Sequence, residues 1–218
     1  MGAHSLRAAG SNDAETLFAI HRESAMTAYV EIFPPDRYRF PDAEMREVWA
    51  QALRDGDTSV LIAERAGSPV GFATASPGWL RNLFVVPAEW GRGAGSALHD
   101  QAVAVLRSGG ASIAQLWVLE ENERARRFYE TRGWRDDGGR SKSEFPPHPV
   151  ELRYALPLGE SRRVTPGRTR PKPPPTHGVK SGYGPRCDAS VSSSGHLRRC
   201  CAGPVAFAAN AWPPEEPP

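Results

Sequence analysis

The sequence predicts an α/β fold in which a β-sheet of six to seven strands is flanked by about four helices. Short runs of apolar and β-branched residues alternate along the chain with longer segments whose apolar residues repeat at helical spacing. Of the 218 residues, 39% are hydrophobic and 24% are charged, which is typical of a globular chain that can bury a sizeable core. The C-terminal part differs in composition, so we expect the folded part to end near residue 156.

The N-terminal part is expected to contain one short strand and two helices. Residues 6–9 are a strand candidate, followed by a polar turn that caps a helix. In that helix Leu17 and Ile20 share the face that we expect to pack on the sheet. Further along the chain, Asp42 is expected to cap a second helix over residues 43–54.

Three strands are expected to follow in close succession. Residues 58–65 and 70–75 predict a hairpin, because the Gly-Ser-Pro sequence between them favours a turn. A second turn then leads into the central strand, residues 80–86. The sheet therefore has its middle strands before the third helix begins.

The third and fourth helices are expected on either side of one more strand. In the third helix Leu98, Ala102 and Val105 repeat at steps of four and three, which predicts an inward face. Residues 111–119 predict the strand that follows. Asn122 is a good cap for the fourth helix, which ends at a glycine.

Two last strands, residues 134–135 and 150–156, are expected to complete the sheet and a folded domain over residues 5–156. The tail, residues 157–218, holds 12 of the chain's 21 prolines together with many Ser, Gly and Arg residues. Such a composition buries too little apolar surface to offset the entropy of ordering a chain, so we expect a disordered tail.

The chemistry of the tail offers little to build a function on. All three cysteines, Cys187, Cys200 and Cys201, lie there, and without a Cys-x-x-Cys pair beside His196 no metal site is expected. Nine Lys and Arg residues against four Asp and Glu leave a nucleic-acid-associated function open. No binding fold or interleaved aromatic residues accompany these charges, so nucleic acid is not expected as a partner.

The cysteine distribution and the N-terminus bear on the compartment. The domain has no cysteine, so it needs no oxidising environment. The N-terminus has no apolar signal core, and no segment approaches the length that spans a bilayer. We therefore expect a cytoplasmic protein without membrane contact.

Residues 80–95 are the most informative stretch of the chain. An apolar, β-branched strand ends at Pro87, and Gly91, Gly93 and Gly95 precede a helix. Glycines leave backbone N–H groups accessible and the helix N-terminus adds partial positive charge, so this stretch predicts an anion-binding loop. A nucleotide P-loop would need Lys directly after the last glycine. A dinucleotide fingerprint would need glycine three places after Gly93, so neither fits.

The spacing of this stretch resembles that of the GNAT superfamily, the acyl-CoA N-acyltransferases. That family has a strand ending in V-x-P, a Q/R-x-x-G-x-G/A loop and a helix, and here Pro87 leads into residues 90–95. Its second motif, L-x-V-x-x-x-N-x-x-A-x-x-F-Y-x-x-x-G-F, is similar to residues 116–134, with Trp134 in the Phe place. The departure is Trp90, where the family more often has Gln or Arg. The resemblance implies the GNAT fold with a central mixed sheet.

The resemblance also implies acetyl-CoA as co-substrate. Backbone groups of the central strand would bind the acyl carbonyl and the pantetheine amides, in a gap where two parallel strands part. These groups belong to Leu83, Phe84 and Val85. The loop would hold the pyrophosphate through its N–H groups, at Trp90, Gly91, Arg92, Gly93, Ala94, Gly95 and Ser96. Asn122 would bind the cofactor or only cap its helix, and Arg126 and Arg127 would meet other phosphates or face solvent.

Tyr129 is the candidate for the catalytic acid. In the family the Tyr of the Phe-Tyr pair points its hydroxyl at the cofactor sulfur and can protonate the thiolate, although an aromatic residue at this spacing also fits the core. Family members that use a carboxylate base carry it four places before the Leu83 position, where this chain has Trp79. The substitutes are His21, Glu23, Glu31, Glu120 and Glu121. Each also fits an ordinary surface or cap position, so no base is assigned.

The leading hypothesis is an N-acetyltransferase that transfers acetyl from acetyl-CoA to a primary amine of a small molecule or a protein. We expect direct attack in a ternary complex, because no cysteine of the domain could carry an acyl intermediate. The alternative, suggested by Trp79, is an acyl-CoA-binding module with little or no turnover. The acceptor stays open, and the sequence is compatible with a monomer or a homodimer.

Overall fold

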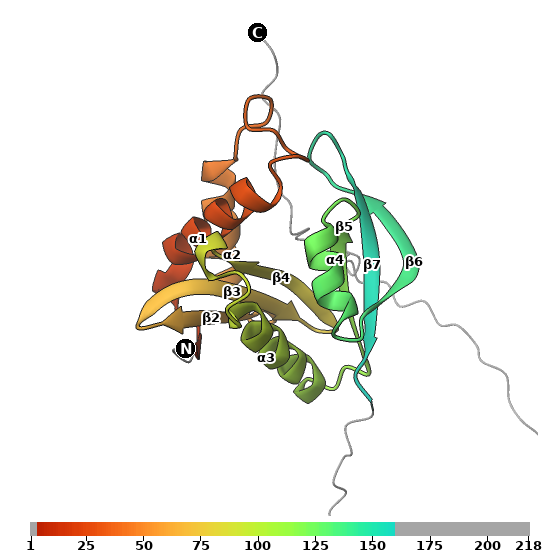
Figure 1. Ribbon diagram of the computed structural model, residues 1–218. Coiled ribbons are helices and arrows are strands. Elements are labelled where there is room, and N and C mark those ends of the chain that lie inside the picture. The colour runs from red at the N-terminus through yellow and green to blue at the C-terminus, as the bar shows by residue number, and fades with distance from the viewer. Residues whose placement is uncertain (1–3, 160–218) are drawn as a thin grey trace, which may run out of the picture. The chain divides into compact units, whose positions relative to one another are not determined.

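Seven strands form one β-sheet in the computed structural model, which describes residues 4–159 (Figure 1). Their bounds are β1 Ser5–Ala8, β2 Ser59–Arg65, β3 Ser68–Ser76, β4 Trp79–Val85, β5 Ile113–Leu119, β6 Arg135–Lys142 and β7 Val150–Pro157. The strand order across the sheet is β1-β2-β3-β4-β5-β7-β6. All neighbours are antiparallel except β4 and β5, which are parallel. The predicted mixed sheet of six to seven strands is confirmed.

Four α-helices accompany the sheet within residues 4–159, as the sequence predicted. Their bounds are α1 Ala14–Ala28, α2 Asp42–Arg54, α3 Ala94–Ser108 and α4 Glu123–Glu130. Two single turns of 3₁₀-helix, η1 Ser11–Asp13 and η2 Pro87–Glu89, precede α1 and the glycine loop respectively. Pro87 suits the start of such a turn, because its fixed φ and missing N–H cost nothing at a helix N-terminus.

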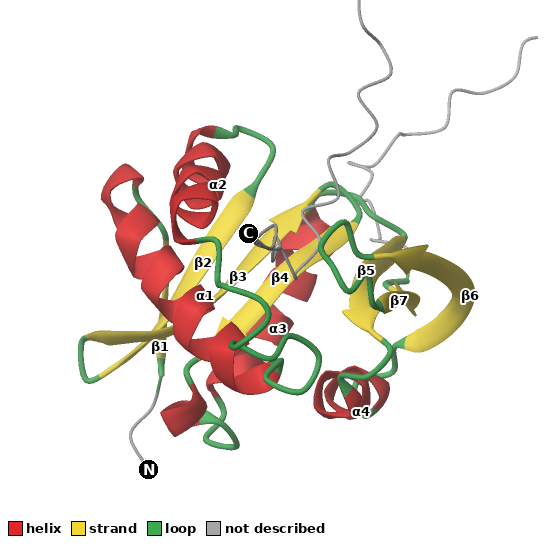
Figure 2. Ribbon diagram, turned by 90° about the horizontal axis from the view of Figure 1, so that it is seen from above, coloured by secondary structure: helices red, strands yellow, loops and turns green. Residues whose placement is uncertain are grey.

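The helices pack on opposite faces of the sheet and create two cores (Figure 2). α1 packs on α2 and against β3 and β4, around a core that includes the fully buried Leu17 and Phe72. α3 packs against β2, β3 and β4 from the other face, around a core that includes Leu98 and Leu116. Because successive residues of a strand point to opposite faces, β4 contributes side chains to both cores.

Three details differ from the sequence expectations. Asp42 is the first residue of α2 and does not cap it, because Pro41 takes the N-cap position. Leu106, and not Val105, continues the inner face of α3 from Leu98 at steps of four, and Val105 is only half-buried. β6 has 8 residues in place of the two expected.

The described domain ends just beyond β7. Leu158 is buried, its N–H donates to the Ser112 carbonyl at 2.9 Å, and its carbonyl accepts from Arg107 Nε at 3.1 Å. The described part therefore includes residues 157–159 of the predicted tail. The rest of that tail, from residue 160 onward, lies outside the described residues. Within residues 4–159, none of the helices has the length and apolar character needed to cross a membrane.

Candidate active site

β4 and β5 part from each other along most of their length. They are parallel neighbours, but only Trp79 and Gln115 at their N-terminal ends are paired. β4 also carries a bulge against β3, where Leu80 and Asn82 have partners and Arg81 between them has none. A bulge bends its strand, so it accounts for β4 diverging from β5 toward the C-terminal ends. The gap between parallel strands that the family resemblance implied is present.

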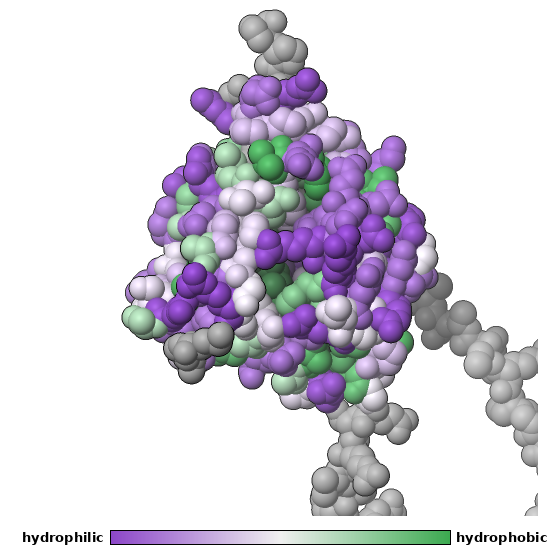
Figure 3. All heavy atoms as spheres, in the orientation of Figure 1, coloured by the Kyte–Doolittle hydropathy of each residue, from purple (hydrophilic) through white to green (hydrophobic). Residues whose placement is uncertain are grey.

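A cleft of about 380 Å³ occupies this gap. It is lined from both cores, by Leu83 and Val85 on the α3 side and by Phe84 and Tyr29 on the α1 side. Figure 3 shows the face of the domain hollowed near its centre, with apolar surface in the hollow and hydrophilic side chains around it. The cleft therefore reaches both faces of the sheet.

The glycine loop lies at one end of the cleft. Gly91 and Gly93 have φ values of 73° and 100°, a left-handed conformation that side chains disfavour. No heavy atom lies within 4 Å of where a Cβ would stand at either glycine, so the backbone is open on that side. Gly93 caps α3, whose first N–H groups have no intrahelical acceptor. This end of the cleft can therefore bind an anion such as a phosphate.

Trp90 ties the loop to the central strand. Its indole Nε1 donates to the carbonyl oxygen of Val85 at 2.6 Å, and the guanidinium of Arg124 lies 3.7 Å from the centre of its ring. Arg124 comes from α4, so this cation–π contact joins the loop to a second helix at the cleft. The Gln or Arg more usual in the family is thus replaced by an aromatic ring that supports an arginine.

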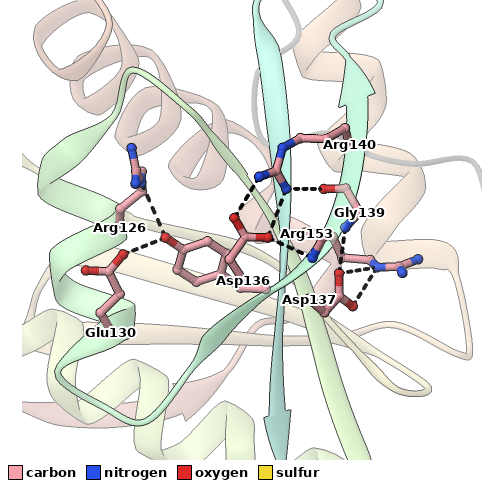
Figure 4. Close-up of polar contacts among 9 residues, drawn as sticks. Arg126, Glu130, Asp136, Asp137, Gly139, Arg140 and Arg153 are labelled. Atoms are coloured by element: carbon pink, nitrogen blue, oxygen red, sulfur yellow. Dashed lines mark hydrogen bonds and ion pairs between the residues drawn. The ribbon is translucent and has the colours of Figure 1, made fainter.

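The cationic side chains that line the cleft are not those that the sequence suggested. Arg92 lies 3.6 Å from Glu89, and Arg127 pairs with Glu123 at 2.7 Å. Arg126 donates to the Glu120 carbonyl and to the Tyr154 hydroxyl, as Figure 4 shows for the tyrosine. All three lie outside the cleft lining, as does the buried Ala94, whereas the other predicted site residues line it.

Arg124 and Arg132 line the cleft from α4 and the turn after it. Arg132 donates to Ser96 Oγ at the start of α3 and lies 3.7 Å from the centre of the Phe128 ring. The signal that could have found both is helical spacing, because they stand four residues before and after Phe128. They therefore form one stripe that faces the glycine loop.

Tyr129 lines the cleft with its ring packed among aromatic neighbours. The ring meets Phe128 and Trp134 edge-on, with centroids 5.3 and 5.8 Å away. Burial raises the pKa of the Tyr129 hydroxyl, although the charge of Arg132 acts in the opposite direction. The phenol therefore stays protonated at neutral pH, as a proton donor must.

Tyr29 faces the same cleft from the end of α1, and sequence reasoning missed it. Burial raises its pKa, the nearby Tyr129 adds to that effect, and a hydrogen bond from Asn122 opposes it. Asn122 also caps α4, because its side-chain oxygen accepts from the Ala125 N–H at 3.1 Å. Asn122 thus serves both the helix and the lining of the cleft.

The base candidates all lie outside the cleft lining. His21 accepts from Trp49 Nε1 at 3.3 Å inside the α1 core, and burial lowers its pKa to about 3. Glu23, Glu31, Glu120 and Glu121 are exposed. Among the lining residues the one carboxylate is Glu89, at the loop end. Both of its Oε atoms accept from Arg65 Nη1 at 2.8 Å. Residues 4–159 therefore place no carboxylate or histidine in the lining at the far end of the cleft.

A phosphate-binding loop that opens into a gap between parallel strands fits a long ligand with phosphates at one end and a reactive group at the other. Acyl-CoA has this form, so fold and site define a CoA-dependent acyltransferase. Residues 22–134 match the model of the acetyltransferase (GNAT) family, and the chain belongs to this family. It is accordingly an acetyl-CoA-dependent acyltransferase.

Comparison with other proteins agrees with this membership. An uncharacterised N-acetyltransferase of Archaeoglobus fulgidus is 35% identical over 103 residues, covering 42% of this chain and 69% of the relative. One of Mycobacterium bovis is 30% identical over 136 residues, covering 59% and 87%. The PaiA N-acetyltransferase of Thermoplasma acidophilum, solved with coenzyme A, shares the fold with a TM-score of 0.57 at 18% identity, covering 69% and 98%.

No metal centre is evident in the part of the chain that the structure describes. Residues 4–159 contain no group of three or more His, Cys, Asp or Glu side chains arranged to hold an ion. The cysteines and the His196 considered in the sequence lie outside this part.

Proposed function

We propose that this acyltransferase transfers acetyl from acetyl-CoA to a primary amine of a small molecule or a protein, by direct attack in a ternary complex. The observation that carries the proposal is the passage of the cleft between β4 and β5. Thioester and amine can then meet from opposite faces of the sheet without a covalent carrier. The absence of cysteine from residues 4–159 agrees with direct transfer.

The predicted cofactor-binding residues have distinct tasks in this proposal. N–H groups of residues 91–96 meet the pyrophosphate, and Arg124 and Arg132 add positive charge there. Backbone groups of Leu83 and Phe84 lie on a strand whose β5 side, among the described residues, is paired only at Trp79, so they can bind pantetheine amides. The pantetheine arm then runs from the glycine loop along β4, with its thioester toward the β4 bulge.

Tyr129 supplies the proton for the leaving thiolate in this mechanism. The neutral amine nitrogen attacks the thioester carbonyl carbon and gives one N–H proton to water, and the C–S bond breaks as the thiolate takes the Tyr129 proton. The hydroxyl makes no hydrogen bond to any residue between 4 and 159, which leaves it available for the sulfur. The phenol is then reprotonated from solvent.

The amine loses its proton to water, because the lining of the cleft supplies no carboxylate or histidine at the thioester end. Only the neutral amine has the lone pair that attack requires. The acceptor must therefore enter as the free base, and the rate is expected to rise with pH until the amine's own pKa is passed.

The test is thiol release from acetyl-CoA across a panel of amines, with the acetylated product identified by mass. CoA affinity is measured in parallel by calorimetry. Amine-dependent release with a one-to-one product supports the proposal. Trp79 at the position of the family's carboxylate favours the alternative of an acyl-CoA-binding module. Tight CoA binding without amine-dependent release on any acceptor would support that alternative.

A further inference from the structure

Arg81 is a cation in the cleft that no carboxylate of residues 4–159 neutralises. Its half-buried side chain lines the cleft, and its Nε donates to Ser76 Oγ at 2.8 Å. Burial lowers the pKa of the Arg81 guanidinium, and no acidic neighbour acts against this effect. Burying a charge without a partner costs free energy, so the position favours an anionic ligand.

A stacked pair of tryptophans lies beside this cation. The Arg81 guanidinium lies 5.1 Å from the centre of the Trp79 ring. Trp79 and Trp117 stack with centroids 6.4 Å apart and planes inclined by 17°, and Trp117 lines the cleft. Trp79 belongs to the residue pair that still joins β4 to β5, so the stacked rings lie where the gap between the strands begins. Apolar walls reduce the access of water and strengthen any ion pair that Arg81 makes.

Arg81 and the glycine loop occupy opposite ends of the cleft. Val85 lies four residue steps along the strand from Arg81, a distance of about 13 Å at ordinary strand rise. Arg124 and Arg132 supply the cations near the loop, where the phosphates of CoA are expected. Arg81 is therefore too far along β4 to serve the same phosphates, and its anion must belong to a group near the thioester.

We infer that Arg81 binds a carboxylate of the acceptor, so that the acceptor is an amino acid or another small amine that carries a carboxylate. This inference rests on the proposed function and names the substrate class of the same site. A polyamine would bring several positive charges toward Arg81, and the one carboxylate in the lining, Glu89, is already engaged by Arg65. A protein N-terminus has no carboxylate beside its amine.

Ser24 offers a second polar contact, on the α1 side of the cleft. Its Oγ is buried, lines the cleft from α1, and has no hydrogen-bond partner among the described residues. A buried hydroxyl normally has a partner. A polar acceptor group that reaches Ser24 would satisfy it.

The experiment compares amino acids with their α-carboxamides as acceptors, one pair at a time. For its preferred pair, the wild-type enzyme should use the amino acid with a kcat/KM at least tenfold higher than for the α-carboxamide. Removing the carboxylate charge lowers the pKa of the neighbouring amine and leaves more of it neutral, which would favour the amide. A preference for the acid therefore reports a carboxylate site.

Arg81→Gln should lower kcat/KM for the acid roughly tenfold to a hundredfold and leave the amide near its wild-type value. Arg153→Gln is the matched control. Arg153 lies 5.8 Å from the other tryptophan of the stack, Trp117, but it is paired with Asp137 at 2.8 Å and lies outside the cleft lining (Figure 4). The control should keep the wild-type ratio of acid to amide.

Three results would overturn the inference. They are an equal loss of acid and amide turnover in Arg81→Gln, a wild-type preference for amides or polyamines, and a loss confined to succinyl-CoA as donor. The last result would assign the anion to the acyl group. Melting temperature and CoA affinity of Arg81→Gln show that the variant is folded.

Product binding separates this inference from the proposed function. Calorimetry with N-acetylated amino acids and their amides, in the presence of CoA, needs no turnover. If no amine is acetylated but N-acetylated acids bind at least tenfold more weakly to Arg81→Gln, the proposed function fails and the carboxylate site stands. If the N-acetylated amino acids bind the wild-type protein and Arg81→Gln equally, or bind neither protein, the assignment of a carboxylate site to Arg81 is wrong.

Discussion

Tyr129 is a residue whose ring and hydroxyl have separable tasks. The ring packs against Phe128 and Trp134, whereas the hydroxyl faces the cleft. Tyr129→Phe keeps the packing and removes the proton donor, so turnover should fall roughly ten- to a thousandfold. CoA affinity and melting temperature should hardly change. Turnover, calorimetric affinity and thermal unfolding of this variant measure the three quantities.

Tyr154→Phe is the matched control for Tyr129. The Tyr154 hydroxyl donates to Glu130 Oε1 at 2.6 Å and accepts from Arg126, at a site outside the cleft lining (Figure 4). This variant should lose some stability and keep its turnover. Wild-type turnover in Tyr129→Phe would remove that residue from the mechanism, and a raised CoA dissociation constant would make it an anchor for the cofactor.

His21 predicts how stability depends on pH. Burial lowers its pKa from 6.5 to about 3, so the folded protein keeps it neutral while the unfolded chain takes up a proton below pH 6.5. The free energy of unfolding should therefore fall by about 1.4 kcal/mol per pH unit between pH 6.5 and 3. His21→Gln retains an acceptor for Trp49 and should lose this component. Urea unfolding at several pH values checks it, and parallel curves for the two proteins would contradict it.

The phase of α4 limited what the sequence could predict about single residues. The second motif indicated a helix with many arginines, but Arg124 and Arg126 lie about 200° apart around it, so the phase of the helix decides which of them faces the cleft. The structure turns Arg126 toward Tyr154 and places Arg124 over Trp90. Tyr29 was missed because its partner Asn122 is far away in the chain, and no local pattern joins the two.

Among the elements, the glycine loop has the sharpest prediction. Gly93→Val would place a branched side chain over the N–H groups at the start of α3, so CoA affinity should fall by well over tenfold. Both this change and Gly67→Val force a side chain into a left-handed conformation, each at a cost of about 1–3 kcal/mol. Gly67 lies in the β2–β3 turn, away from the cleft.

Calorimetric titration of both variants with CoA separates strain from loss of the phosphate site. Gly67→Val should keep the wild-type affinity and share the loss of melting temperature. Unchanged CoA affinity in folded Gly93→Val would show that the loop does not hold the phosphates.

β4 and β6 show where local sequence is sufficient for predicting an element and where it is not. Pro87 and the glycines set the end of β4 and the start of α3 within a residue or two, because backbone conformation itself requires them. The Asp-Asp-Gly-Gly of β6 has no strand pattern. It is a strand because β7 lies beside it, with Asp137 paired to Arg153, and such long-range pairing leaves no local signal.

At the scale of the whole molecule, the predicted division between domain and tail can be tested by two truncations. A chain ending at Gly159 should keep the wild-type melting temperature and CoA affinity, since we expect nothing beyond it to contribute to the core. A chain ending at Leu156 loses buried Leu158 and its bonds to Ser112 and Arg107. Its melting temperature should fall by several degrees, for a loss of about 2 kcal/mol.

Thermal unfolding and CoA titration of the two shortened chains decide this. A loss of several degrees in the longer chain would show that the tail packs on the domain. Equal stability of both chains would mean that Leu158 contributes little.

The bulge in β6 bears on how the domain behaves at high concentration. β6 and the four-residue β1 are the two edges of the sheet, where free backbone groups can recruit another chain. The β6 ladder shifts register between Asp136 and Arg140, and these two exposed charged residues pair with each other. A twisted, charged edge at one end and a very short one at the other oppose strand-to-strand aggregation, and self-association by sheet extension is disfavoured at both.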